Sequence, residues 1–149
     1  MKRCVNIFAA VLCGVLLLTS VSGRKDGLVS APAVDSKLAF SMTESVFRFG
    51  PRLPDTASSK ALVNFIADKA KAFGASVKII EFTAMTPEGM KTFRNVEAVV
   101  EGKDKGRFVI VGTHFDTKKL MTVPDFAGAN DGSSGTGLQL AMIKAAVAS

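Results

Sequence analysis

The segment Phe108–Val111 constrains the fold most, because its apolar side chains follow one another without a polar residue between them. A strand with one face in water alternates apolar and polar residues, whereas a continuous apolar run is typical of a strand covered on both faces. The segment therefore predicts a strand at the centre of a sheet. A hydrophobic share of 48% supports a globular core and argues against a disordered or collagen-like chain.

Helical and strand patterns surround this central segment. Apolar spacing predicts helices first and then strands, with a last helix after a polar loop. The order predicts an α/β domain in which helices flank a mixed β-sheet. Such a sheet normally continues beyond a helix that follows a central strand, so we expect the domain to be truncated. The predicted helices are Ser36–Phe49, a helix capped by Thr56 that runs to Phe73, and Ser133–Val147; the other strands are Ser76–Thr83 and Met90–Val100.

The N-terminal segment has the pattern of a secretory signal peptide. Lys2 and Arg3 precede the mostly apolar stretch Val5–Leu18, and small residues follow at Thr19–Gly23. We expect residues 1–22 to be a signal peptide, 23–35 a flexible lead-in, and 36–149 the domain itself. Export would place the protein in the periplasm or outside the cell, with membrane contact only through the signal segment. A retained membrane anchor and a buried helix stay open as alternatives.

Composition excludes several classes of site. Both cysteines, Cys4 and Cys13, lie in the predicted signal peptide, so a disulfide scaffold and a cysteine-based zinc site are not expected. The net charge of +6 comes from scattered basic residues, which does not indicate a nucleic-acid surface. His114 is the only histidine in the sequence.

Two short segments contain the residues that fit metal or acid–base chemistry. His114 and Asp116 follow the predicted central strand, at the edge where α/β sheets bind ligands. Their spacing points both side chains the same way in a strand, and a carboxylate beside an imidazole fixes its tautomer. Asp131 lies in a second segment, Gly128–Gly135, whose glycines allow a loop to turn the carboxylate toward a metal.

Structural roles for the same residues stay open on spacing alone. A lone histidine such as His114 is often a structural or surface residue. The segment around Asp131 also fits a simple connector in which Ser133 or Ser134 caps the last helix.

The two segments together resemble the zinc-dependent peptidase family M28, which includes bacterial aminopeptidases and glutaminyl-peptide cyclotransferases. Members carry a His-x-Asp after a central strand and a Gly-Ala-x-Asp loop with a Ser-Gly before a helix. The resemblance covers Ser36 to Val147. The matching residues are His114-Phe115-Asp116, Gly128-Ala129-Asn130-Asp131, Ser134-Gly135, Phe49-Gly50-Pro51-Arg52 with Pro54 and Thr56, Phe73-Gly74-Ala75, and Asn95-Val96.

The resemblance implies a zinc-exopeptidase (phosphorylase/hydrolase-like) fold and a site for one or two zinc ions. Asp131 matches a metal ligand in both branches of the family. His114 matches a ligand in the two-zinc aminopeptidases and need not bind metal in the cyclotransferases. Asp116 matches the catalytic-site residue that orients the others. The family's later carboxylate and histidine ligands have no counterpart here, so the chain by itself is expected to be incomplete and inactive.

Peptide or protein N-termini are the substrates that the resemblance implies. A cyclotransferase converts an N-terminal glutamine to pyroglutamate and releases ammonia, whereas an aminopeptidase hydrolyses the N-terminal residue. The segment Phe49–Arg52 favours the cyclotransferase branch, as does Gly132, which stands where many aminopeptidases have a second acidic residue. A non-catalytic, exported interaction domain is a further alternative, because metal ligands are missing.

Overall fold

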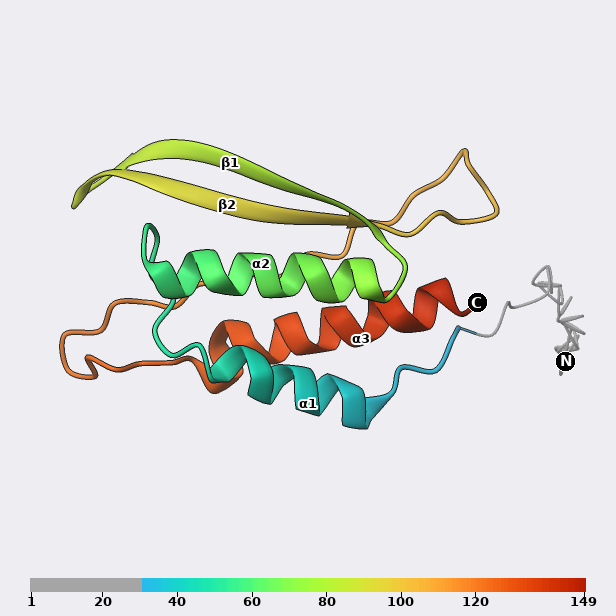
Figure 1. Cartoon of the computed structure of the whole chain (residues 1–149), viewed down its shortest axis with the longest axis horizontal. Coiled ribbons are helices and arrows are strands. Elements are labelled where there is room, and N and C mark those ends of the chain that lie inside the picture. Colours follow the sequence, from blue (N-terminus) through green and yellow to red (C-terminus); the bar gives the residue numbers. More distant parts are fainter. Residues whose placement is uncertain (1–30) are drawn as a thin grey trace, which may run out of the picture. The chain divides into compact units, whose positions relative to one another are not determined.

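The computed structural model describes residues 31–149 (Figure 1). The predicted signal peptide, residues 1–22, lies outside the described residues, as does most of the predicted lead-in. The division of the chain at residues 22 and 35 therefore stays a prediction. Among the described residues, no helix has the length and apolar character of a membrane span.

Two helices open the described part of the chain, and each begins at a side-chain cap. Helix α1 spans Ser36–Phe47, and Asp35 accepts hydrogen bonds from the Lys37 and Leu38 amides at 2.9 and 3.1 Å. Helix α2 spans Ala57–Ala72, and the predicted cap, Thr56, accepts from the Ser59 amide at 3.1 Å. These bonds satisfy amide groups that a first helical turn leaves without partners.

A β-hairpin follows α2, and Gly74 makes the bend between them. Gly74 has φ of +101°, a backbone conformation that glycine adopts without strain. Strand β1 spans Ser76–Thr86 and strand β2 spans Gly89–Val99, joined by a turn at Pro87 and Glu88. The strands are antiparallel, and Phe82 pairs directly with Phe93, whose ring centroid is 5.5 Å away. The hairpin is longer than predicted at its turn end.

The last helix, α3, spans Gly135–Val147 and packs beside α1. Helix α2 lies between the hairpin and the pair α1–α3 (Figure 1), and it contacts β1, β2 and α3. The core forms where these layers meet. Its buried members are Met42, Val46, Leu62, Ile66, Ala70, Ala75 and Leu140.

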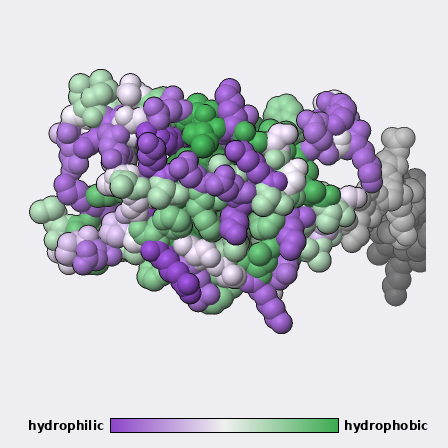
Figure 2. Space-filling view, viewed as in Figure 1, coloured by the Kyte–Doolittle hydropathy of each residue, from purple (hydrophilic) through white to green (hydrophobic). Residues whose placement is uncertain are grey.

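The segment Phe108–Val111 forms no strand, so the prediction of a buried central strand there is wrong for the described residues. Phe108, Val109 and Ile110 are 85, 89 and 82% exposed. A strand buried at the centre of a sheet needs a hydrogen-bonded neighbour on each side. In residues 31–149 the sheet consists of β1 and β2, which pair with each other. The space-filling view in Figure 2 shows hydrophobic residues at the surface among hydrophilic ones.

Candidate functional site

The three residues singled out by the sequence lie together at one place. The His114 ring is between two carboxylates: Nε2 is 3.0 Å from Asp131 Oδ1, and Nδ1 is 3.4 Å from Asp116 Oδ1. Each of the three side chains is about half exposed, between 51 and 56%. The site is thus open to a ligand from solvent, and it joins segments that are separated by a long loop.

The surroundings of His114 suit a proton on Nδ1. Nδ1 is 3.2 Å from the carbonyl oxygen of Asp116, in addition to the Asp116 carboxylate. Both oxygens are acceptors, and in the neutral tautomer with the proton on Nδ1 the other nitrogen, Nε2, is an acceptor. Nε2 faces the carboxylate of Asp131 at 3.0 Å. In that tautomer, a proton or a metal cation between Nε2 and the carboxylate would relieve the repulsion between the two acceptors.

The separation of these two atoms is slightly shorter than that of two ligands on one zinc ion. Zinc binds histidine nitrogen and carboxylate oxygen at about 2.0–2.2 Å, so two ligands of a tetrahedral ion lie about 3.3–3.6 Å apart. From the observed 3.0 Å, the two side chains would have to move apart by a few tenths of an ångström to hold the ion. The second nitrogen of a zinc-bound histidine normally donates to a carboxylate or carbonyl, and Asp116 supplies both.

The site brings together fewer ligands than a catalytic zinc requires. Three protein ligands are usual. Among residues 31–149, no group of three or more histidine, cysteine, aspartate or glutamate residues is arranged to hold a metal. His114 and Asp131 could thus supply two ligands, and Asp116 contacts His114 from the opposite side of its ring.

Backbone irregularity before α3 points Asp131 at the histidine. The turn Ala129–Ser134 (η1) is broken at Asp131, which has φ of −84° and ψ of 100°, and at Gly132, which has φ of +90°. A Cβ atom on Gly132 would be 2.9 Å from the Asp116 carbonyl oxygen and 3.4 Å from the His114 ring. Glycine is required here both by its conformation and by the lack of space.

Ser134 occupies the N-cap position of α3, but the side chain of neither serine in this turn makes a capping hydrogen bond. Ser134 Oγ donates to the Asn130 carbonyl oxygen at 2.7 Å and makes no capping bond. Ser133 Oγ is buried and accepts a hydrogen bond from Arg52 at 3.0 Å. The turn is therefore hydrogen-bonded to Arg52, a residue distant from it in the sequence.

Arg52 is fully buried behind the site, and its guanidinium contacts both site segments. Nε donates to the Phe115 carbonyl oxygen at 2.7 Å, and Nη1 donates to the Ala127 carbonyl oxygen at 2.7 Å. Other acceptors are the carbonyl oxygens of Gly50 and Gly128 and the hydroxyl of Ser133. A guanidinium has five N–H donors, and all of these acceptors are neutral. Burial lowers the pKa of Arg52, and the negative charges of Asp116 and Asp131 oppose that effect.

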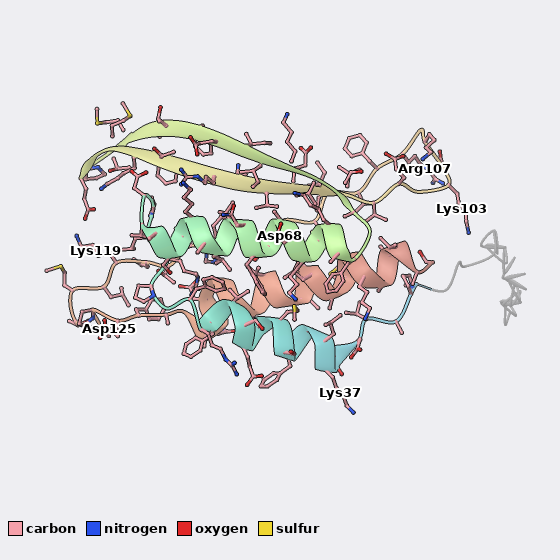
Figure 3. The ribbon with its side chains drawn as sticks, in the orientation of Figure 1. Lys37, Asp68, Lys103, Arg107, Lys119 and Asp125 are labelled. Carbon is pink, nitrogen blue, oxygen red and sulfur yellow. The ribbon has the colours of Figure 1, made fainter. Side chains whose placement is uncertain are left out.

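The loop between the two site segments lies against the turn of the hairpin. Lys119 Nζ is 2.7 Å from Glu88 Oε1, and this hydrogen bond from the ammonium lowers the pKa of Glu88. Figure 3 shows Lys119 and Asp125 on the loop. The loop leaves the site after Thr117 and returns to it at Gly128.

The sequence patterns identified the three acidic and histidine side chains of the site but not the role of Arg52. The spacing of His114 and Asp116 and the glycines around Asp131 indicated the three side chains that the structure brings together. Arg52 was identified only as part of the segment Phe49–Arg52. The one available signal was an arginine between prolines, because all of its side-chain partners except Gly50 lie 63 to 81 residues further along the chain.

Known proteins resemble this chain in part of its sequence and most of its fold. Residues 95–149 match the family model described as Peptidase family M28. None of the curated proteins matches the chain.

Solved structures give longer matches than the family model. A Zn-dependent exopeptidase from Parabacteroides distasonis is 27% identical, with a TM-score of 0.67, over 76% of this chain and 42% of its own. A Porphyromonas gingivalis glutaminyl cyclase is 26% identical, with a TM-score of 0.66 and the same coverage. A leucine aminopeptidase precursor from Bacteroides thetaiotaomicron is 26% identical, with a TM-score of 0.65, again with that coverage.

The chain spans about two fifths of the length of these structures. Their folds confirm the predicted α/β class, although the sheet in residues 31–149 has only its antiparallel hairpin. The predicted resemblance to the zinc-dependent peptidase family M28 is thus confirmed, by sequence over residues 95–149 and by fold over 76% of the chain.

Proposed function

We propose that this chain forms part of a zinc-dependent enzyme that acts on peptide N-termini, of the glutaminyl-peptide cyclotransferase type. The observation that carries the proposal is the pair His114 Nε2 and Asp131 Oδ1, a ring nitrogen and a carboxylate oxygen 3.0 Å apart. This pair suits a cation, and the solved structures of similar fold include glutaminyl cyclases and a Zn-dependent exopeptidase. Further ligands have to come from outside residues 31–149.

Each site residue has a separate task in this proposal. Zinc, when bound, would polarise the γ-amide of an N-terminal glutamine as a Lewis acid. Asp131 and His114 would hold the ion, and Asp116 would keep the proton on Nδ1 so that Nε2 stays free to bind. In the reaction, the substrate's α-amine forms a bond to the carbonyl carbon of the γ-amide (Cδ), the bond from Cδ to the amide nitrogen breaks, and a proton passes from the α-amine to the leaving nitrogen. Ammonia leaves and pyroglutamate remains.

Gly132 favours the cyclotransferase over the aminopeptidase. The resemblance places a second acidic residue after the Asp131 position in many aminopeptidases. Here a side chain at that position would meet the Asp116 carbonyl oxygen and would need φ of +90°. The leucine aminopeptidase precursor and the exopeptidase of similar fold keep aminopeptidase activity as the second candidate.

Zinc binding is the first test of the proposal. The nitrogen-15 spectrum of histidine-labelled protein reports on His114 alone, because the chain has no other histidine. Zinc should shift Nε2 and leave Nδ1 protonated. Asp131→Asn should weaken the shift strongly, whereas Asp125→Asn, on the loop, should leave it unchanged. The titration extends to a large excess of zinc, because two protein ligands hold the ion only weakly. Absence of any zinc-dependent shift in the wild type under that excess would refute the metal site and favour the interaction-domain alternative.

Activity is best compared in protein isolated from its native source. Ammonia release from a peptide with N-terminal glutamine supports the cyclotransferase, whereas amine release from a leucine anilide supports the aminopeptidase. A chelator should abolish either activity, and added zinc should restore it. Zinc binding with neither activity would contradict both enzyme proposals for that protein.

We also propose that the protein is exported after removal of residues 1–22. The basic, apolar and small-residue parts of that segment support this proposal. The intact mass of the native protein tests it. A mass lacking those residues is expected, whereas a mass that retains them would favour the membrane-anchor or buried-helix alternatives.

A further inference from the structure

Arg52 connects the two segments that carry the proposed metal ligands. Nε donates to the carbonyl oxygen of Phe115, the residue directly after His114. Nη2 donates to Ser133 Oγ, two residues beyond Asp131. We propose that Arg52 is a positioning residue of the metal site, and that its rigid guanidinium sets the separation between His114 and Asp131. This inference rests on the proposed zinc site.

The backbone of Arg52 is fixed to the same segment as its side chain. Its amide donates to Thr117 Oγ1 at 2.7 Å, and the Thr117 amide donates to the Arg52 carbonyl oxygen at 3.3 Å. Thr117 is 4% exposed. The guanidinium therefore has a fixed place relative to His114. From that place, its bonds to Ala127 and Ser133 hold the ends of the turn that contains Asp131.

The shape of the guanidinium matters more than its charge in this arrangement. Within residues 31–149, Arg52 makes no hydrogen bond to a carboxylate, and its side-chain acceptors are backbone carbonyl oxygens and one hydroxyl. Its positive charge would repel a zinc ion bound in front of it. A contribution through charge would therefore weaken zinc binding. Only the planar set of donors can favour the ion, by holding its ligands in place.

Substitutions of Arg52 separate these two effects. Lysine keeps the charge and cannot reach acceptors on several sides at once. Methionine removes both the charge and the donors. Positioning predicts that Arg52→Lys and Arg52→Met both weaken zinc binding by about tenfold or more, the usual effect of losing a residue that orients metal ligands. If only the charge of Arg52 mattered, Arg52→Met would bind zinc more tightly and Arg52→Lys would bind it as the wild type does.

The control separates positioning from general stability. Val46→Ala removes methyl groups from a fully buried core residue on α1 and should lower the melting temperature without touching the site. Zinc affinity is measured from the His114 nitrogen-15 shift in the full chain, at a temperature where circular dichroism shows each variant to be folded. Val46→Ala should bind zinc within about twofold of wild type, since its effect is on stability alone.

Two outcomes would overturn the inference: wild-type zinc affinity in folded Arg52→Lys, or an equal loss of affinity in Val46→Ala. If Arg52→Lys does not fold, Ser133→Ala tests the same connection, and it should weaken zinc binding in the same direction. Unchanged affinity in Ser133→Ala would then overturn the inference.

Amide hydrogen exchange tests the role of Arg52 independently of zinc binding. The amides of Thr117 and Ser133 donate to the carbonyl oxygens of Arg52 and Gly128. Their hydrogen exchange should accelerate in Arg52→Lys relative to the amides in the interior of α2. If the wild type binds no zinc, the proposed function fails, and this exchange still decides whether Arg52 holds the two segments together.

Discussion

Gly137 is where α3 comes closest to α1, and its replacement by alanine tests how these helices pack. A Cβ atom there would be 2.5 Å from the Thr43 amide nitrogen and 2.7 Å from the Ala39 carbonyl oxygen. It would also collide with the Thr43 hydroxyl. Real Cβ contacts are ordinary from 3.4 Å outward, so α1 and α3 would have to separate by about 0.7–0.9 Å.

The energetic cost follows from which atoms are in the way. Overpacking of a core costs about 1–3 kcal/mol, and rigid backbone atoms place Gly137→Ala near the upper value. Alanine favours a helix interior over glycine by about 0.9 kcal/mol, which offsets part of that cost. We expect a net loss of about 2 kcal/mol in the free energy of unfolding. At about 4 °C for each kcal/mol, the melting temperature should fall by about 8 °C.

Thermal denaturation followed by circular dichroism measures this loss. The matched control is Gly102→Ala, because a Cβ atom on Gly102 would have no neighbour within 4 Å. It should change the free energy of unfolding by less than about 0.5 kcal/mol. A Gly137→Ala protein that melts at or above the wild-type temperature would refute the close approach of α1 and α3, because helix propensity would then have been the larger effect.

Two further predictions concern the exposed segment and the hairpin. Ile110→Lys should raise solubility, measured by sedimentation of concentrated protein, and leave the melting temperature nearly unchanged, because Ile110 is 82% exposed; a drop of many degrees would show that the segment is covered. Asp55 accepts a hydrogen bond from the Thr92 amide, and this bond lowers the pKa of Asp55. Its stabilising effect is therefore present above the ordinary aspartate pKa of about 3.9 and is lost as the pH falls toward the lowered value. Between about pH 6 and pH 3, the melting temperature of Asp55→Asn should fall less than that of the wild type. An equal fall would contradict a stabilising role for the bond between Asp55 and Thr92.

Local patterns in the sequence were enough to predict the helices and the hairpin. In α2, the spacing of Leu62, Ile66 and Ala70 gave the buried face, and Thr56 gave the beginning of the helix. These signals are local, because a helix cap and a helical face involve residues within a few positions of one another. The turn between β1 and β2 is local in the same way.

Interactions between distant residues account for the differences from the prediction. The apolar run Phe108–Val111 predicts a strand buried on both faces. The pattern does not show which other strands would lie beside it. The role of Arg52 depends on acceptors at Phe115 and Ser133, which no spacing rule connects to it. His114 and Asp116 were easier to recognise, because they are only two residues apart in the sequence.

The contacts of Arg52 also bear on when the proposed metal site could form. They join residues 63 to 81 positions apart, so they require closure of a long loop and belong to a late stage of folding. Until then, nothing holds His114 and Asp131 at ligand distance, and an unfolded chain has no preformed site for zinc. Metal would accordingly be acquired after folding, in whichever compartment the chain reaches its native structure. The ions available in that compartment, rather than those present where the chain is synthesised, would then decide which metal the site takes up.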